Sequence, residues 1–481
     1  MMCGARVYID TIGCYKNVED SERAAGLLEA AGHAMAATPD EADVIVVNTC
    51  GFIEDAKRES IDRILELAEH RERGAKLVVS GCLSQRYPDE IFEEIPEADA
   101  VIGVNEYGRL PDIISKIHGE APERRIRMTD GKPSVLTGER RILTPGATAY
   151  LKVAEGCDNR CAYCAIPMIR GPYRSVPMET LVREAASLSG GGMRELVLIA
   201  QDVSAYGSDI YGRYALPELL EKLAHAGESD ATEWMSHGDT GLALRDVHIA
   251  AESDAPELAR HDAESDAPAW IRLMYCYEER VTDELIDAIA RLDNVCKYID
   301  IPLQHISDGV LARMGRRSTR KSIEGVLDRL HAAVPDIAIR TTFMTGFPGE
   351  TEDDFTELMD FAAERKFERL GVFAYSAEDG TRAAGMDDQI PRELAEERRD
   401  ALMTQQVDIS LETNKRLIGR ALTVLVEDAE DETTFVGRTQ YDAPEIDGEV
   451  VFSSPSPVGV GSFARVLVTD AMDYDLVGEA I

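Results

Sequence analysis

Three cysteines in one short stretch are the strongest chemical signal in the sequence. Cys157, Cys161 and Cys164 stand in EGCDNRCAYC, with the spacing CxxxCxxC. Three thiolates this close can share one metal centre, and a 4Fe-4S cube, normally held by four thiolates, would keep one iron open for another ligand. A structural zinc site is the alternative, but it needs a fourth ligand, and the following AIPMIRGPYR holds no Cys or His. The spacing therefore favours an open iron-sulfur cluster.

A second set of three cysteines is spread along the N-terminal part of the chain. Cys14, Cys50 and Cys82 each follow a short apolar run, which reads RVYID, DVIVVN and KLVVS in turn. If these runs are parallel strands, their carboxyl ends meet at one edge of a sheet, where open α/β sheets bind ligands. One such cysteine alone would be interpreted as a core thiol, whereas three at one edge predict a second three-ligand centre. The cysteines that lack such partners are predicted to be structural, namely Cys3, Cys276 and Cys296.

The elements that must position the scattered set form a small α/β domain. Short runs rich in Val and Ile predict strands over 6–10, 43–48 and 76–80. A helical period follows each strand, over about 19–31, 53–72 and 88–95. Residues 119–145 contain three prolines and no sustained period, which predicts a connection between domains.

Six further apolar runs alternate with helical stretches from residue 150 onward. They predict strands over 150–154, 195–200, 270–275, 297–301, 339–343 and 369–374. Repeated βα units of this number form either a doubly wound sheet or a partial (β/α) barrel, and the CxxxCxxC loop follows the first strand. A charged helix is predicted over 391–417, and the strand-like runs after it predict a five-stranded small barrel.

One segment, residues 225–269, fits neither pattern. It holds 11 acidic and 2 basic residues, repeats AESDAP at Ala251 and Ala263, and contains four of the nine histidines. Acidic sequence of such low complexity is typical of a solvated, disordered insertion, and its irregularly spaced histidines are weak candidates for metal ligands. Because the segment lies in a helix-to-strand connection, we expect its deletion to spare chemistry at the opposite end of the strands.

The whole chain is acidic, with 89 Asp and Glu against 51 Lys and Arg in 481 residues and a net charge of -38. This balance disfavours unspecific binding to nucleic acid or anionic lipid, since both need dense positive charge. The first residues lack the pattern of a secretory signal, and no apolar run approaches the roughly 18 residues that span a bilayer. We therefore expect a cytoplasmic protein of about three domains, in which clustered cysteines bind metal rather than form disulfides.

Together these features resemble the radical SAM methylthiotransferases over nearly the whole chain. The resemblance rests on TIGCYKNVEDSE, VVNTCGFIEDA and VVSGCL around the scattered cysteines, and on the CxxxCxxC loop with Tyr163 before its last cysteine. It implies an α/β fold with an N-terminal three-Cys domain, a partial (β/α)6 radical SAM barrel and a C-terminal OB-like TRAM barrel. The implied bounds are 5–118 for the first domain, 119–142 for a linker, 143–390 for the radical SAM core with its insertion at about 235–269, 391–413 for a connecting helix and 414–481 for TRAM.

The resemblance also implies the cofactors. One 4Fe-4S cluster would be held by Cys14, Cys50 and Cys82, and a second, which binds S-adenosylmethionine, by Cys157, Cys161 and Cys164. The family replaces an unactivated C–H bond by a methylthio group, which needs radical chemistry, a reduced electron donor and a sulfur donor. Gln201 and Asp202 follow the second barrel strand and are the best candidates for cofactor contacts. Weaker candidates after later strands are Gln304, His305, Thr345 and Gly346, while Thr351 is predicted to cap a helix.

Two substrates are associated with bacterial branches of this family, an adenosine of transfer RNA and an aspartate β-carbon in the twelfth protein of the small ribosomal subunit. The stretch YDAPEIDGEV, Asp202 and the pair His305-Ile306 resemble the second branch. Residues 414–481 carry 13 acidic and 5 basic side chains, which would repel RNA and attract a basic protein. We expect modification of the ribosomal protein, with no strong nucleic-acid binding. Transfer RNA modification is the alternative, and a non-catalytic iron-sulfur scaffold is an alternative of another class.

Overall fold

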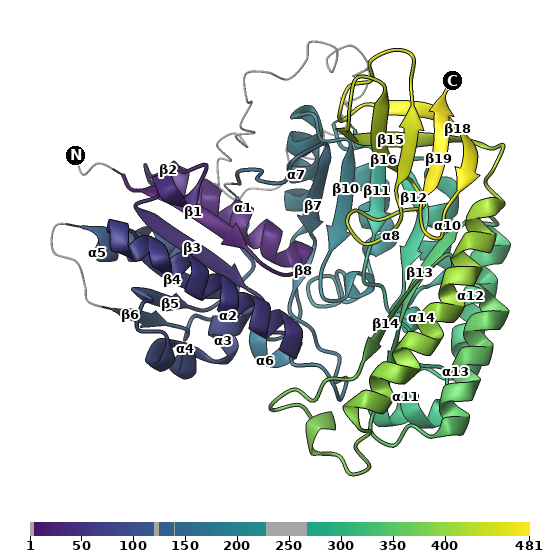
Figure 1. The fold of residues 1–481 in the computed structure, drawn as a ribbon, viewed down its shortest axis with the longest axis horizontal. Coiled ribbons are helices and arrows are strands. Elements are labelled where there is room, and N and C mark those ends of the chain that lie inside the picture. Colours follow the sequence, from purple (N-terminus) through teal and green to yellow (C-terminus); the bar gives the residue numbers. More distant parts are fainter. Residues whose placement is uncertain (1–3, 120–124, 139, 228–266) are drawn as a thin grey trace.

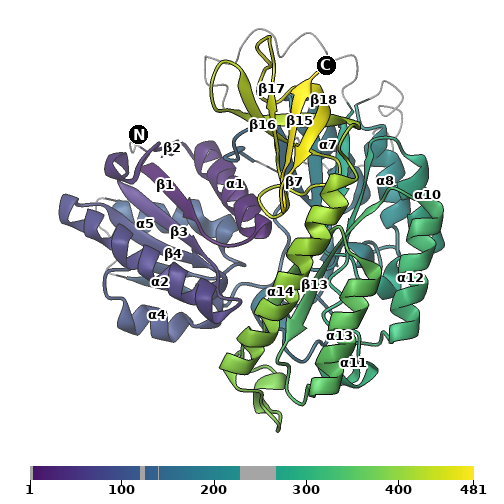
Figure 2. The ribbon, with the colours of Figure 1, turned by 45° about the vertical axis from the view of Figure 1, so that its right-hand side comes forward.

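The computed structural model describes residues 4–119, 125–138, 140–227 and 267–481, which form three packed parts (Figure 1). The N-terminal sheet and its helices lie beside a larger sheet, and a small barrel of C-terminal strands sits at one end of that larger sheet (Figure 2). Most of the predicted acidic insertion, residues 228–266, falls outside the described residues. Every helix within the described ranges is too short or too polar to cross a bilayer.

Six parallel strands form the N-terminal sheet, in the order β2-β1-β3-β4-β5-β6. Their bounds are β1 (Arg6–Thr11), β2 (Ala34–Met35), β3 (Val44–Thr49), β4 (Lys76–Gly81), β5 (Ala100–Ile102) and β6 (Ile126–Met128). Helices cover both faces, with α1 (Tyr15–Ala30) and α5 (Leu110–His118) on one side and α2 (Glu54–Ala68) and α4 (Pro88–Glu94) on the other. This double cover explains why β3 is buried at every position.

The strand order of this sheet locates its binding edge. The order β2-β1-β3-β4-β5 is that of a doubly wound sheet, in which the direction of winding reverses between β1 and β3 and ligands bind beyond the carboxyl ends. The three predicted strands and their helices are present. The structure adds β2, β5 and β6, which are too short to show a period, and β6 lies within the stretch predicted as an interdomain connection.

The second sheet also has six parallel strands, but their order is β7-β10-β11-β12-β13-β14, so each new strand joins the same edge. This single direction of winding identifies a partial barrel rather than a doubly wound sheet, as the family resemblance implies. The strands are β7 (Thr148–Lys152), β10 (Glu195–Ile199), β11 (Trp270–Leu273), β12 (Val295–Asp300), β13 (Ala338–Thr345) and β14 (Arg369–Ala374). The outer helices are α7 (Met178–Gly190), α8 (Leu216–Ala224), α10 (Asp283–Arg291), α11 (Asp308–Met314), α12 (Arg320–Ala333) and α13 (Glu352–Arg365).

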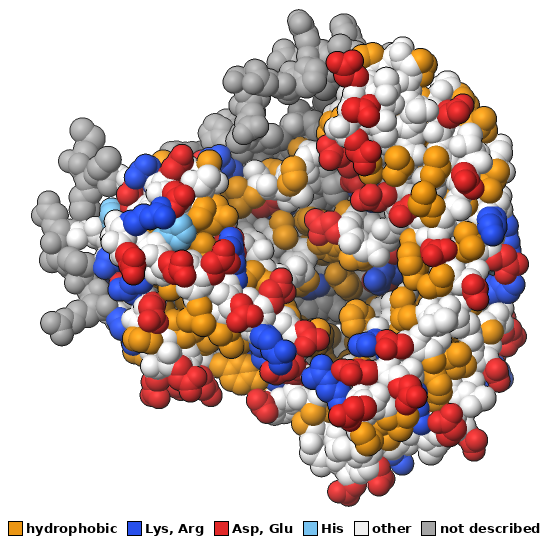
Figure 3. All heavy atoms as spheres, viewed as in Figure 1, with side chains coloured by type: hydrophobic (Ala, Val, Ile, Leu, Met, Phe, Trp, Pro, Cys, Tyr) orange, Lys and Arg blue, Asp and Glu red, His pale blue; other side chains and the backbone are white. Residues whose placement is uncertain are grey.

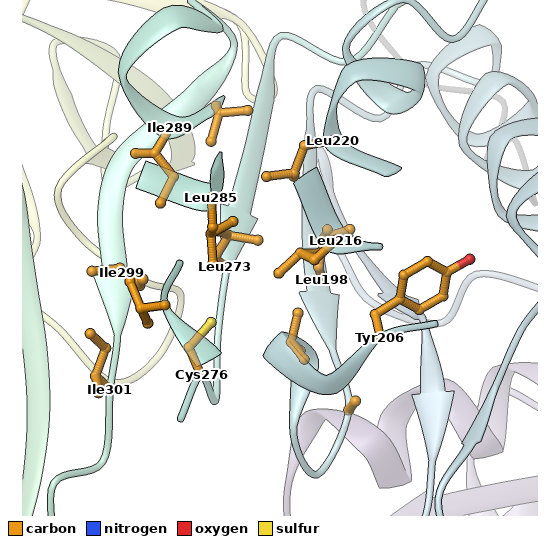
Figure 4. Close-up of a cluster of buried hydrophobic side chains, with 14 of the residues drawn as sticks. Leu198, Tyr206, Leu216, Leu220, Leu273, Cys276, Leu285, Ile289, Ile299 and Ile301 are labelled. Atoms are coloured by element: carbon orange, nitrogen blue, oxygen red, sulfur yellow. The ribbon is translucent and has the colours of Figure 1, made fainter. Parts of the chain in front are cut away.

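Aliphatic side chains between these strands and the outer helices form the largest core (Figure 4). Leu198 of β10 and Leu273 of β11 are fully buried together with Leu216 and Leu220 of α8 and Leu285 of α10. Successive side chains of a strand point to opposite faces. The inner face of the sheet is therefore free to carry polar and aromatic groups, and these line the region described below.

A long helix, α14 (Arg392–Lys415), runs along β14 and leads into the C-terminal barrel (Figure 2). The barrel is closed, with the order β15-β16-β17-β19-β18. Its strands are β15 (Ala421–Ala429), β16 (Thr434–Thr439), β17 (Val450–Ser453), β18 (Phe463–Ala471) and β19 (Leu476–Ala480). The predicted five-stranded barrel is thus confirmed, and it packs on the larger sheet where Phe463 meets Trp270 edge-on, with ring centroids 4.9 Å apart.

Candidate functional site

The structure brings the three loops of the scattered cysteines together at the predicted edge. Cys14 directly precedes α1, Cys50 follows β3, and Cys82 begins the short helix α3 (Cys82–Arg86). A Cβ atom added at Gly13 would lie 2.8 Å from the Cβ of Cys50, and one at Gly51 would lie 2.9 Å from the carbonyl carbon of Cys82. The three loops are therefore in direct contact.

Asn17 holds these loops in place, although no pattern in the sequence indicated this role. Its Nδ2 donates to the carbonyl oxygens of Ile12, 2.7 Å away, and Thr49, 3.2 Å away, while the side chain is fully buried. Its Oδ1 accepts a hydrogen bond from Arg170 at 2.9 Å and lies 3.9 Å from the sulfur of Cys82. A single amide thus ties β1, β3 and the loop after β4 together.

The three thiols of this set differ in their electrostatic surroundings. Burial would raise the pKa of Cys14, but Lys16, Arg170 and two backbone N–H groups outweigh it and lower that pKa. Burial raises the pKa of Cys50 to about 12, with the neighbouring Cys82 adding to the shift, and burial also raises the pKa of Cys82 against the opposing charge of Arg170. Without bound metal, Cys50 would stay protonated at neutral pH.

The second set lies on one loop between β8 (Ala154–Glu155) and α6 (Ile166–Arg170). The sulfur of Cys161 lies 3.3 Å from the hydroxyl of Tyr277, and the Cys164 N–H donates to the Cys161 carbonyl at 3.2 Å. Burial raises the pKa of Cys157 and of Cys164 to about 12. Like Cys50, these thiols would be protonated at neutral pH without metal, and a bound metal would displace their protons into the solvent.

The chemistry of the donor sets can be compared with the two predicted kinds of centre. Within the described ranges, no three Cys, His, Asp or Glu side chains group around a point where one metal ion would sit. A zinc ion would need four such ligands at about 2.3 Å or less. Thiols that each bind a different iron of one cube can stand further apart. Three thiols are the ligand type of an iron-sulfur cube that keeps one iron open, so the donor chemistry of both sets is compatible with such a cluster.

The two cysteine sets meet across the domain boundary. Cys82 packs against Ala165, the residue after Cys164, and against Ile169 of α6. Arg170, at the end of α6, donates to the sulfur of Cys82 at 3.3 Å. Sequence reasoning missed this contact because 88 residues separate its partners.

A buried ionic network fixes the two domains relative to each other. Arg170 also binds Asp20 of α1 at 2.8 Å and Glu155 at 3.0 Å. Lys152 binds Glu19 at 2.7 Å and Glu155 at 3.2 Å. Further members of the network are Glu22, Arg23, Arg140 and Glu184. Because losing one partner of a buried ion pair is costly, this network holds the cysteine sets at a fixed separation.

Gln201 and Asp202, the predicted cofactor contacts, lie beside the second set and differ in how many of their polar atoms are already hydrogen-bonded. Asp202 accepts from Asn159 at 2.8 Å and Arg280 at 2.6 Å, and also from Ser204. Its oxygens are thus occupied, and they pin the loop that carries Cys157 and Cys161. Gln201 donates to Glu155 at 2.7 Å, while its buried Oε1 has no partner among the described residues. Gln201 is therefore the better placed of the two to accept a bond from a cofactor.

The weaker candidates for cofactor contacts also differ: some have structural contacts, whereas His305 has a ring nitrogen without a hydrogen-bond partner among the described residues. Thr345 donates to the carbonyl of Ala395, and Gly346 leaves no room for a Cβ beside the same residue, so both serve the packing of α14. Burial lowers the pKa of His305 to about 4, and its Nε2 has no hydrogen-bond partner within the described chain. Gln304 adopts a positive φ of 70°, and Thr351 caps α13 as predicted.

A loop of the C-terminal barrel reaches the inner face of the partial barrel beside the scattered set. Asp447 accepts from Tyr298 at 2.7 Å, and the carbonyl of Pro444 accepts from the hydroxyl of Tyr15, the residue after Cys14. Tyr15 in turn stacks on Tyr150 of β7, with ring centroids 4.4 Å apart. Figure 3 shows the surface hollowed between the N-terminal domain and the rest of the molecule, so all three parts of the chain border this region.

Comparison with known proteins identifies the parts. Residues 6–103 match UPF0004, an uncharacterized protein family, residues 151–362 match the radical SAM superfamily, and residues 418–481 match a TRAM domain. The chain is 42% identical over 478 residues to ribosomal protein uS12 methylthiotransferase RimO of Lachnoclostridium phytofermentans, a match that covers 99% of this chain and 100% of that protein. The chain belongs to the RimO family of radical SAM methylthiotransferases. The protein of the same name from Desulforamulus reducens is 43% identical over 474 residues, with 98% of each chain covered.

Solved structures agree with the fold expected of a RimO family member. The radical S-adenosylmethionine methyltransferase TsrM from Kitasatospora setae, solved with cobalamin and a [4Fe-4S] cluster bound, matches with a TM-score of 0.53. The match covers 89% of this chain and 81% of that one, at 14% sequence identity. At this identity the likeness concerns the fold alone. Both the family resemblance and the fold class predicted from the sequence are confirmed.

Proposed function

We propose that this RimO family member adds a methylthio group to the β-carbon of an aspartate in ribosomal protein uS12. The proposal rests on the proximity of the two cysteine sets at the domain boundary, where Cys82 of the first set packs against Ala165, the residue after Cys164, and accepts a hydrogen bond from Arg170. Full-length relatives carry the name uS12 methylthiotransferase, which supports the ribosomal protein as the substrate.

The two sets would hold two 4Fe-4S clusters. Cys14, Cys50 and Cys82 would bind the first cluster, and Cys157, Cys161 and Cys164 the second, with S-adenosylmethionine at its open iron and Gln201 as a polar contact. When bound, the second cluster and S-adenosylmethionine supply the radical chemistry that breaks an unactivated C–H bond. The chain itself orients both sets, through Asn17 on one side and Asp202 on the other. An electron donor and a sulfur donor complete the reaction, which we place in the cytoplasm.

The surface charge of the TRAM barrel supports a basic protein as the partner. Figure 3 shows acidic side chains over the visible face of the barrel, and 13 acidic residues lie within 414–481. Such a surface attracts a basic protein and speeds the encounter at low salt. It would weaken binding to RNA, whose affinity depends on neutralising phosphates.

Anaerobic reconstitution followed by mass spectrometry tests the proposal. We expect about eight irons per chain, as two four-iron clusters require, release of 5′-deoxyadenosine with dithionite, and a methylthio mass gain on uS12. Modification of transfer RNA nucleosides instead would favour the alternative substrate. Iron binding without 5′-deoxyadenosine release would identify a scaffold rather than an enzyme.

A further inference from the structure

Lys16 is a buried cation beside the first cysteine set. It is the second residue of α1, two positions after Cys14, and only 8% of its surface is exposed. Its Nζ lies 3.8 Å from the centroid of the Tyr275 ring. The side chain thus crosses from the N-terminal domain to the inner face of the partial barrel.

What distinguishes Lys16 from the other buried cations is that no carboxylate of the described residues lies within ion-pair distance of it. In the described part of the chain, eight other Lys and Arg side chains are as buried, and each has a carboxylate oxygen within 2.8 Å: Arg23, Arg140, Lys152, Arg170, Arg272, Arg316, Arg398 and Arg438. Lys16 forms no ion pair with any described residue. The one opposite charge described near Lys16 is the thiolate of Cys14, a predicted cluster ligand whose pKa Lys16 lowers. Burying an ammonium without a carboxylate partner is costly, and a ring contact worth roughly 0.5–2 kcal/mol offsets only part of that cost.

The polar groups around the Tyr275 backbone, next to Lys16, already have hydrogen-bond or ion-pair partners. Tyr275 adopts a positive φ of 57°, which is unusual for a bulky residue. Its N–H donates to Asp300 at 2.9 Å, and its carbonyl accepts from Val203 at 3.1 Å. Asp300 also pairs with Arg340 at 3.1 Å. These bonds hold the backbone of Tyr275 in its unusual conformation, which places the ring next to the ammonium; such strain is often found at functional sites.

We propose that Lys16 binds the side-chain carboxylate of the substrate aspartate, an inference that rests on the proposed function. The carboxylate carbon of an aspartate is bonded directly to the β-carbon that would be modified. An ammonium two residues from Cys14 therefore holds the reacting carbon beside the first cysteine set. The same ammonium provides specificity, because asparagine has nearly the same shape but no charge to pair with it.

The test compares two synthetic peptides that span the modified site of uS12, one with the target aspartate and one with asparagine in its place. Binding is measured by calorimetry on the anaerobically reconstituted enzyme. The unaltered enzyme is expected to bind the aspartate peptide roughly tenfold to a hundredfold more tightly, as a charge-assisted hydrogen bond predicts. In Lys16→Gln this ratio falls to near one, whereas Lys16→Arg, which keeps the charge, retains most of it. Lys321→Gln, an exposed lysine on α12, serves as the control and keeps the full ratio.

Two outcomes overturn the inference. Equal affinity of the unaltered enzyme for both peptides would show that the carboxylate is not recognised, and this result needs no variant. An undiminished ratio in Lys16→Gln would assign recognition to another group. Failure of the proposed function looks different, because neither peptide would bind and mass spectrometry would find no methylthio gain with the unaltered enzyme.

Discussion

The two sets each bring three cysteines together, but the structural elements that do so differ. The first set is assembled from three strand ends, with Cys14, Cys50 and Cys82 separated by more than thirty residues each. The second set occupies one stretch of eight residues, from Cys157 to Cys164. The first depends on the register and close approach of whole strands, whereas the second depends on a few side chains that hold one loop. A substitution that distorts the N-terminal sheet should therefore disturb cluster binding by the first set and leave the second set unchanged.

Replacing a cysteine in each set is expected to give the largest effects. Cys161→Ala should abolish S-adenosylmethionine cleavage, because the open-iron centre of the second set is lost. Cys50→Ala should abolish methylthio transfer while the second set still releases 5′-deoxyadenosine. Iron content, 5′-deoxyadenosine release and peptide mass are measured in parallel on both variants. Loss of 5′-deoxyadenosine release in Cys50→Ala would show that the sets do not function separately.

Gly51→Ala tests the dependence of the first set on close backbone approach. An added Cβ would lie 2.7 Å from the Cα of Leu83 and 2.9 Å from the carbonyl carbon of Cys82, so the two strand ends must separate. Overpacking of this kind costs about 1–3 kcal/mol. We expect the variant to lose about half of its iron and all transfer, and to retain S-adenosylmethionine cleavage.

Gly190→Ala is the matched control for this steric test. Gly190 lies at the end of α7, and an added Cβ would meet nothing within 4 Å. The iron content and the denaturation midpoint of the Gly190→Ala variant should match those of the unaltered chain. Full iron loading in Gly51→Ala would mean that the first set tolerates a shifted strand, and the contrast between the sets would then be wrong.

The two cysteine sets and the strands that carry the first set could be predicted from the sequence. The side chains that hold the sets in place could not. The apolar runs before Cys14, Cys50 and Cys82 predicted parallel strands, and the strand order places them at one edge. The roles of Asn17, Lys16 and Arg170 remained hidden, because their partners belong to other elements. Asp202 was predicted to contact the cofactor, and only its full set of hydrogen bonds indicates that it positions a loop. Periodicity reports which face of an element is buried, and not which distant group it meets.

Arg170→Gln removes a positive charge next to the first cysteine set and leaves the second set unaltered. The guanidinium donates to the sulfur of Cys82 and pairs with Asp20 and Glu155. Removing one partner from a buried ion network costs about 3–5 kcal/mol, which chemical denaturation will measure. Hydrogen bonds and charge near cluster sulfurs set reduction potentials, so the cluster of the first set should titrate at a more negative potential. An unchanged second cluster, followed by its own resonance signal, is the internal control.

Tyr277→Phe is the counterpart in the second set and should have the smallest effect. The hydroxyl of Tyr277 lies 3.3 Å from the sulfur of Cys161, and with a thiolate there it can only donate. Removing it leaves the ring over which Arg316 lies, at 4.4 Å, so the packing is retained. Because the lost donor is neutral, the potential of the second cluster should fall by less than that of the first cluster falls in Arg170→Gln. A redox titration that found the larger shift in Tyr277→Phe would reverse the order, and would mean that the neutral donor, rather than the charged one, dominates at these sulfurs.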